Sequence, residues 1–187
     1  MRNLLLIGFM IGFIATPVAA GELRGVTMPD SITVGENTLV LNGMALRKKV
    51  IFKVYVAGLY LPARETDARK ILSADSPRRT VMHFLRSVGP GKINGAWYDG
   101  LEANTPGYSQ DLKKRFDTMA GYMDKVKSGD KLVFTYLPGT GTEVRVRETV
   151  KGVIPGKDFA DALFACWIGE KPGPGEDFKE GLLGLDN

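Results

Sequence analysis

Residues 42–61 read NGMALRKKVIFKVYVAGLYL, and the second half of this run is the strongest strand signal in the chain. Val, Ile, Phe and Tyr recur from residue 49 to residue 61, and these β-branched and aromatic residues are enriched in strands. Asn42-Gly43 before the run predicts a turn, and Pro62 after it predicts a stop. We therefore expect one continuous strand over residues 49–61.

Side chains on such a strand alternate between its two faces. The expected apolar face, suited to packing under helices, comprises Val50, Phe52, Val54 and Val56. The expected mixed face comprises Lys49, Ile51, Lys53, Tyr55, Ala57 and Leu59. Arg47 precedes Tyr55 by an even number of residues, so an unbroken strand also places Arg47 on the mixed face.

Arg47 and Tyr55 on one face would form a carboxylate receptor beside an apolar groove. A guanidinium binds both carboxylate oxygens in a fork, and a phenol donates a third hydrogen bond. The alternative interpretation is an exposed basic turn followed by an ordinary strand tyrosine.

The remainder of the chain alternates irregularly between strand and helix signals. Further strands are predicted at residues 31–34, 38–41, 79–88, 131–137 and 143–154, and helices at 67–72, 92–104, 109–126, 157–168 and near 176–183. This order disfavours a doubly wound parallel sheet, which needs strict alternation. It favours an α+β fold, in which an antiparallel sheet has its helices gathered on one face.

The first residues predict export. Arg2 supplies a positive start, residues 4–15 form an uncharged apolar run, and Pro17-Val18-Ala19-Ala20 offers the small residues of a cleavage site. We expect a signal peptide over residues 1–20, cleaved after Ala20, and a single domain over residues 21–187. The expected location is the bacterial periplasm or the exterior. An uncleaved N-terminal anchor is the alternative.

Composition narrows the possible chemistry. The single cysteine, Cys166, excludes an internal disulfide, and with the single histidine, His83, it excludes a Cys₂His₂ zinc site. We expect no metal and no cofactor. The 25 basic and 21 acidic residues give a formal charge of +4, but aromatic residues do not interleave with the basic ones. Nucleic acid is therefore not an expected partner.

Three motifs occur in an order that resembles a known family. They are FKVYVAGLYL at residues 52–61, GLEAN at residues 100–104 and WIGEKP at residues 167–172. They resemble the core strand, the end of the first long helix and the C-terminal turn of the chalcone isomerase-like family, particularly its bacterial exported branch. This resemblance spans the chain from about residue 25 to residue 184. It implies an open-faced β-sandwich, with a large antiparallel sheet backed by helices and a cleft between them.

The resemblance also implies site residues. Arg47 matches the arginine that steadies negative charge in plant chalcone isomerases, and Asn104 matches their asparagine. Tyr55, Trp97 and Cys166 stand where those enzymes have a threonine, a tyrosine and a small hydroxyl residue. The plant fatty-acid-binding members of the fold pair the arginine with a tyrosine to hold a fatty-acid carboxylate. Arg47 and Tyr55 are similar to that pair.

We therefore expect an exported, non-catalytic binding protein for a fatty acid or similar amphipathic carboxylate, with no membrane span after removal of the signal peptide. The expected ligand-binding residues are Arg47, Tyr55, Asn104, Trp97 and Cys166. Helix termination by Asn104 and core packing by Trp97 and Cys166 are the alternative interpretations. Two other functions stay open. One is an isomerase that closes a chalcone-type α,β-unsaturated ketone, and the other is a structural module of the cell envelope with a vestigial cleft.

Overall fold

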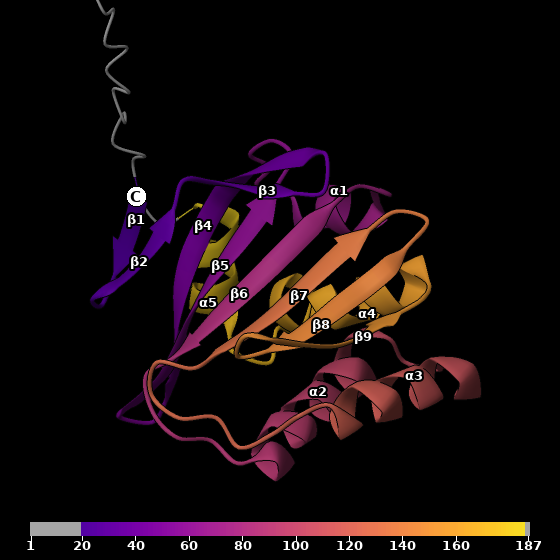
Figure 1. Cartoon of the computed structure of the whole chain (residues 1–187). Coiled ribbons are helices and arrows are strands. Elements are labelled where there is room, and N and C mark those ends of the chain that lie inside the picture. The colour runs from indigo at the N-terminus through magenta and orange to yellow at the C-terminus, as the bar shows by residue number, and fades with distance from the viewer. Residues whose placement is uncertain (1–19, 186–187) are drawn as a thin grey trace, which may run out of the picture.

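A curled antiparallel sheet of seven strands forms the centre of the protein, and the strands lie side by side in their order along the chain (Figure 1). The computed structural model describes residues 20–185. The sheet contains β3 (Ser31–Val34), β4 (Asn37–Lys49), β5 (Phe52–Leu61), β6 (Arg78–Phe84), β7 (Lys131–Leu137), β8 (Gly141–Val146) and β9 (Thr149–Ile154). A separate hairpin contains β1 (Ala20–Leu23) and β2 (Val26–Pro29).

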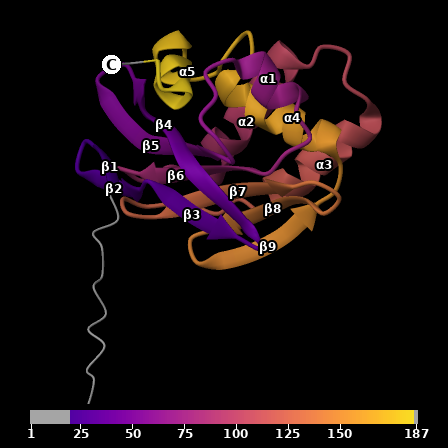
Figure 2. The same ribbon diagram turned by 90° about the horizontal axis from the view of Figure 1, so that it is seen from above.

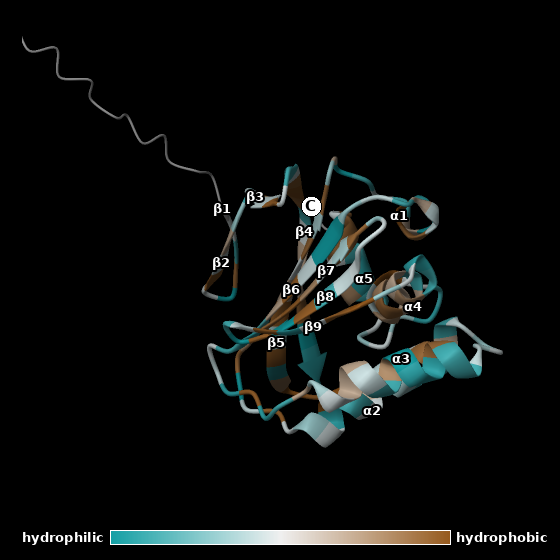
Figure 3. Cartoon of the chain, turned by 45° about the vertical axis from the view of Figure 1, so that its right-hand side comes forward, coloured by the Kyte–Doolittle hydropathy of each residue, from teal (hydrophilic) through white to brown (hydrophobic). Residues whose placement is uncertain are grey.

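The helices gather on one face of this sheet, as Figure 2 shows from above. They are α1 (Ala68–Ser73), α2 (Pro90–Asn104), α3 (Gln110–Gly121), α4 (Lys157–Ile168) and α5 (Glu176–Leu183). Two of them have side-chain caps: the Asp67 carboxylate accepts hydrogen bonds at the start of α1, and the Ser109 hydroxyl accepts one at the start of α3. The outer helix α3 is largely hydrophilic in Figure 3. The predicted α+β layout is confirmed.

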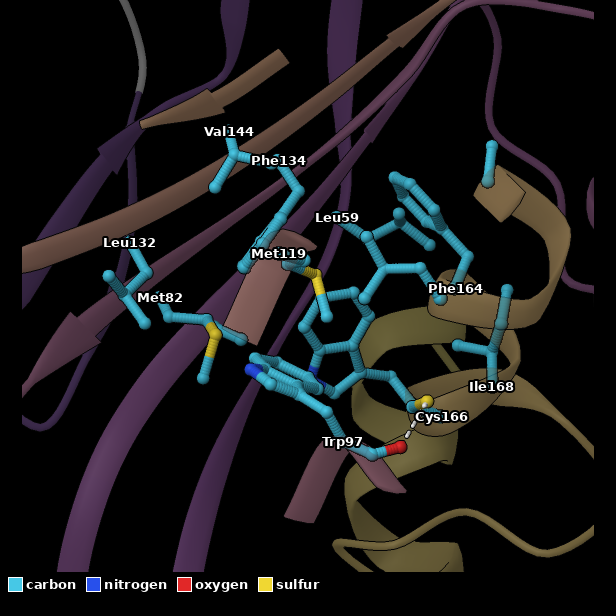
Figure 4. Packing of buried hydrophobic residues seen from close by; sticks show 14 of the residues in the cluster. Leu59, Met82, Trp97, Met119, Leu132, Phe134, Val144, Phe164, Cys166 and Ile168 are labelled. Carbon is cyan, nitrogen blue, oxygen red and sulfur yellow. Dashed lines mark hydrogen bonds between the residues drawn. The ribbon is translucent and has the colours of Figure 1, made fainter. Parts of the chain in front are cut away.

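The main core lies between the sheet and the helices. Its centre is an aromatic cluster around Trp97, which Figure 4 shows near Phe134. The ring of Trp97 meets those of Phe134 and Trp167 edge to face, with centroids 5.4 and 5.2 Å apart. On the other face of the sheet, Met28 of the β1–β2 hairpin packs with Val56 and Tyr60 in a second, smaller core. Within residues 20–185, no helix is long and apolar enough to cross a membrane.

Two predicted strands contain a turn: the first covers β5 and the turn before it, and the second covers most of the β8–β9 hairpin. The strand expected over residues 49–61 is broken by a turn at Val50 and Ile51, and the one expected over residues 143–154 is broken at Arg147 and Glu148. Val50 and Arg147 both have a φ of 56°, in the left-handed region that glycine and asparagine usually occupy. These turns were missed because neither carries a turn-forming residue.

Asn42-Gly43 is a β-bulge and not the predicted turn. The register between β4 and β5 shifts by one residue there, and the Asn42 amide bonds the backbone of Glu65 and the carbonyl of Leu182. Gly43 is needed because α5 packs directly on the strand: a Cβ at this position would overlap the carbonyl oxygen of Gly181. The residues that predicted a turn therefore fasten α5 to the sheet.

A second bulge, at Val54, reverses the predicted faces of β5. Arg47 pairs with Tyr55 while Lys48 pairs with Lys53, so Val54 is an extra residue that changes the alternation. Tyr55, Ala57 and Leu59 consequently belong to the main core under the helices, whereas Val56 faces the β1–β2 hairpin. The predicted assignment of Val56 to the helix side, and of Tyr55 to the opposite side, is wrong for this reason.

The predicted signal peptide lies outside the described residues except for Ala20, where β1 begins. Smaller differences concern element ends. β6 ends at Phe84 and α3 ends at Gly121, both earlier than predicted. The segments that follow them pair as short irregular stretches, with an isolated bridge between Val88 and Val126.

Candidate functional site

A cleft of about 490 Å³ lies between the sheet and helices α2 and α4. This volume is typical of small-molecule sites, which span roughly 300–1,000 Å³. The end of β4, the start of β5, the end of β6 and residues 173–174 complete its walls. Four of the five predicted site residues line it, namely Arg47, Tyr55, Trp97 and Cys166, and Asn104 does not.

Arg47 and Tyr55 are direct partners across the β4–β5 hairpin. Directly opposed residues of an antiparallel pair present their side chains on the same face of the sheet. The sequence analysis placed both residues on one face of a single strand. The structure also brings them together, but through cross-strand pairing and not through an even spacing along one strand.

The Arg47 side chain is half-buried at the cleft and is held by the backbone. Its Nη1 donates a hydrogen bond of 2.7 Å to the carbonyl oxygen of Pro174. No carboxylate of residues 20–185 forms a salt bridge with it. A guanidinium has five N–H donors, so Arg47 keeps most of its binding capacity for another group.

Tyr55 is buried beside Arg47, with its ring against those of Phe84 and Phe178 at centroid distances of 5.5 and 5.7 Å. Burial raises the pKa of the Tyr55 phenol, and the Trp167 side chain and the Arg47 charge only partly oppose this rise. The phenol is therefore neutral at physiological pH. It can donate a hydrogen bond to an anion held by Arg47.

Trp97 and Cys166 belong to the wall where α2 meets α4. The indole nitrogen of Trp97 is buried and has no hydrogen-bond partner among the described residues. The Cys166 thiol points to backbone oxygens, with Sγ 3.9 Å from Trp97 O (Figure 4) and 3.4 Å from Ala162 O. Burial raises the pKa of this thiol to about 12, so it is not a reactive thiolate at neutral pH.

Asn104 fastens a loop and does not face the cleft. Its Nδ2 donates to the carbonyls of Gly100 and Lys171 at 3.0 and 2.9 Å, and its Oδ1 accepts from the Lys171 N–H at 2.8 Å. This loop continues to Pro174, whose carbonyl holds Arg47. Asn104 therefore acts on the site through the loop. This helix-terminating asparagine agrees with the alternative that its position in the sequence suggested.

Two of the motifs that predicted the family contact each other here. A Cβ on Gly100 would lie 2.6 Å from Cys166 Sγ, so only glycine allows α2 and α4 this close approach. Asn104, at the end of the same motif, bonds Lys171 in the C-terminal motif. Residues 100–104 and 166–172 thus form the rear support of the cleft.

Further charged and apolar residues, which the sequence alone did not indicate as site residues, complete the cleft. Three further cations line it, Lys49, Arg86 and Lys92, against a single acid, Asp99. The apolar lining includes Phe52, Val54, Met82, Phe84, Val88, Ile93 and Trp167. Arg86 follows β6 and Lys92 lies in the first turn of α2, so only the folded chain shows that they share a cleft with β4 and β5.

His83, the only histidine of the chain, lies on the opposite face of the sheet. It lines a second cavity of about 350 Å³ with Arg79, Lys131 and Arg145. Burial lowers the pKa of His83, and the charge of Lys131 lowers it further. No group of three or more metal-ligating side chains occurs within the part of the chain that the structure describes.

The fold is shared with a solved protein. A crystal structure of a fatty-acid binding protein from Arabidopsis thaliana superposes with a TM-score of 0.69 at 15% sequence identity, covering 88% of this chain and 96% of that chain. No curated protein sequence matches. The family model described as chalcone isomerase-like matches residues 20–184. The chain therefore belongs to the chalcone isomerase-like family.

Proposed function

We propose that this protein binds a fatty acid or a similar amphipathic carboxylate in the cleft. Arg47 and Tyr55 hold the carboxylate, and the tail lies against the apolar lining of the cleft. The observation that carries this proposal is an arginine that has no acidic partner among residues 20–185 and lies directly opposite a buried tyrosine in a largely apolar cleft.

The chemistry of these groups matches a carboxylate. Hydrogen bonds between a guanidinium and a carboxylate are charge-assisted and are stronger than neutral ones. The excess of cations over acids at the cleft attracts an anion before contact. The unpartnered indole N–H of Trp97 supplies another donor in the same wall. The likeness to a protein described as fatty-acid binding supports the same class of ligand.

The proposal also includes the cellular location predicted from the first residues. The protein is exported, residues 1–20 are removed, and the binding site works in the periplasm or outside the cell. Intact mass and N-terminal sequencing of the protein from a periplasmic extract test this part. A chain that begins at Gly21 supports it, and a chain that still begins at Met1 contradicts it.

The binding proposal is tested by native mass spectrometry and by titration with oleate. A bound fatty acid, or saturable binding of added oleate, is expected for the parent protein. Arg47→Ala loses a charge-assisted hydrogen bond worth roughly 1.5–3 kcal/mol, so its affinity falls about tenfold or more. Arg64→Ala is the matched control, since this exposed arginine lies after the far end of β5.

Three outcomes would change this assignment. A bare mass with no oleate binding removes the proposal and favours the structural module of the envelope. Turnover of a chalcone above its spontaneous cyclisation, lost in Arg47→Ala, favours the isomerase. Equal oleate affinity of Arg47→Ala and the parent rejects Arg47 as the head-group site.

A further inference from the structure

The hairpin that joins β4 to β5 ends in side chains that the fold does not use. We call residues 48–53, with the sequence KKVIFK, the β4–β5 tip. Val50, Ile51 and Phe52 expose 88%, 82% and 52% of their surface. The other large apolar side chains exposed within residues 20–185 are scattered, at Val150, Val153 and Leu185. Three consecutive exposed apolar residues are therefore a distinct feature of this molecule.

The backbone of the β4–β5 tip makes this apolar sequence more unusual. The turn has two residues, and Val50 adopts a φ of 56°. Two-residue hairpin turns favour glycine, asparagine or aspartate at positive φ, and a β-branched residue is strained there. Neither packing nor turn geometry explains a valine at this position. Strained and exposed residues of this kind are found at sites of interaction.

Cations surround the apolar residues of the β4–β5 tip. Lys48, Lys49 and Lys53 are exposed, and none of them pairs with an acidic residue of the described chain. The guanidinium carbon of Arg86 lies 4.3 Å from the centroid of the Phe52 ring. Apolar side chains that project from a group of basic residues match an anionic membrane surface. The apolar groups enter the head-group region and the cations approach the phosphates.

The β4–β5 tip also lies at the cleft. Two residues of the tip, Lys49 and Phe52, also line the cleft. Arg86, which contacts the Phe52 ring, lines it as well. Val50 and Ile51 do not line it. Because the tip borders the cleft, a surface that binds the tip would lie beside the cleft. Val50 and Ile51, the two most exposed side chains, are free to contact that surface.

We propose that the β4–β5 tip docks on the surface of an anionic phospholipid bilayer. Val50 and Ile51 insert among the head groups, and Lys48, Lys49 and Lys53 approach the lipid phosphates. This inference goes beyond the proposed carboxylate binding and does not depend on it, because docking needs no ligand in the cleft. Where both hold, the bilayer lies next to the cleft that receives the ligand.

The test is co-sedimentation with vesicles in the absence of fatty acid. The parent protein is expected to bind vesicles that contain phosphatidylglycerol and to bind pure phosphatidylcholine vesicles much more weakly. Each basic residue at an anionic surface adds about fivefold to partitioning, so replacing Lys48, Lys49 and Lys53 by Gln lowers binding by roughly a hundredfold. The double variant Val50→Ser, Ile51→Ser loses about tenfold or more through its apolar contacts.

Matched controls exist for both variants. Val150→Ser with Val153→Ser removes two exposed valines from β9, which four strands separate from β4. Arg64→Gln, Arg69→Gln and Lys70→Gln remove three charges beyond the far end of β5. Both controls are expected to bind vesicles like the parent. All variants share the parent's N-terminus, and their thermal unfolding confirms that they fold.

Three results would overturn the proposal. The first is that both tip variants bind vesicles as well as the parent does. The second is that the parent binds the two kinds of vesicle equally. The third is that the parent sediments without vesicles and that the Val50 and Ile51 changes abolish this sedimentation. The last result would assign the β4–β5 tip to self-association. Oleate titration of the Val50→Ser, Ile51→Ser variant keeps this test separate from the proposed function, since its cleft is unchanged.

Discussion

Arg47 and Arg78 both lie on the helix side of the sheet, at opposite ends of the strands, and they have opposite environments. Arg78 is fully buried, donates to the Ile71 carbonyl and to the Asp161 carboxylate, and lies over two aromatic rings. Arg47 is half-buried and bonds one backbone carbonyl at the cleft. One arginine is used by the fold, whereas the other retains free donors.

The difference separates structural from binding charges in this protein. A buried arginine with a carboxylate and stacked rings is tied to the fold because removal of its carboxylate leaves a buried charge unpaired. A partly exposed arginine without a carboxylate costs the fold little and can receive an anion. The following changes test that distinction, beginning with the largest expected effect.

Arg78→Met should destabilise the protein most. It leaves the Ile71 carbonyl and one side of Asp161 unpaired, although Lys157 still contacts Asp161 at 2.6 Å. Breaking a fully buried pair costs roughly 3–5 kcal/mol, and the partial exposure of Asp161 together with its remaining lysine places the expected loss near the lower limit. Urea unfolding measures it. A loss in the range of an exposed pair, about 1 kcal/mol or less, would show that Arg78 is not structural.

Two glycines of α2 should respond with opposite signs. Gly100→Ala forces a Cβ to within 2.6 Å of Cys166 Sγ, and overpacking of this kind costs about 1–3 kcal/mol. Gly95→Ala meets no atom within 4 Å and should stabilise the helix by about 0.5–1 kcal/mol. Thermal unfolding of the two variants compares the packed part of α2 with the part that lines the cleft. Changes of the same sign would contradict this difference.

Arg47→Lys should weaken ligand binding without affecting the fold. Lysine keeps the positive charge but lacks the planar fork that binds both carboxylate oxygens. We expect oleate affinity about tenfold lower and a free energy of unfolding within about 0.5 kcal/mol of the parent. Isothermal titration and urea unfolding give the two values. A large loss of stability with unchanged affinity would make Arg47 resemble Arg78.

Titration of Cys166 should leave the free energy of unfolding independent of pH near neutrality. Burial raises its pKa from 9.0 to about 12, so the folded protein keeps the proton longer than the unfolded chain does. The stabilising contribution is complete below about pH 9 and declines as the pH rises toward 12. At pH 8, alkylation of the native thiol should be about a thousandfold slower than alkylation of the unfolded chain. Equal rates would show that the thiol is accessible.

Local signals explain which elements were predicted correctly. The side chains of Asp67 and Ser109 cap helices by accepting hydrogen bonds from backbone N–H groups two or three residues later, and Gly35, at a φ of 58°, turns the β3–β4 hairpin. Such residues act within a few positions, so their effect is visible in the sequence. Arg47 and Tyr55 were predicted from their spacing as well as from the family resemblance, whereas Asn104, Trp97 and Cys166 were predicted from the resemblance alone. Four of them line one cleft, but Asn104 proved to fasten a loop through bonds that no local pattern reveals.

The sequence by itself determined the helices, most of the strands and the layout of an antiparallel sheet with helices on one face. These follow from periodicity, capping and turn residues, which act locally. Only the tertiary structure decided which side of β5 faces the helices, because a bulge at Val54 and a turn at a strained Val50 reset the alternation. It also decided that Arg47 meets Tyr55 across two strands. Cross-strand register depends on pairing between distant backbone groups, so no single segment of sequence specifies it.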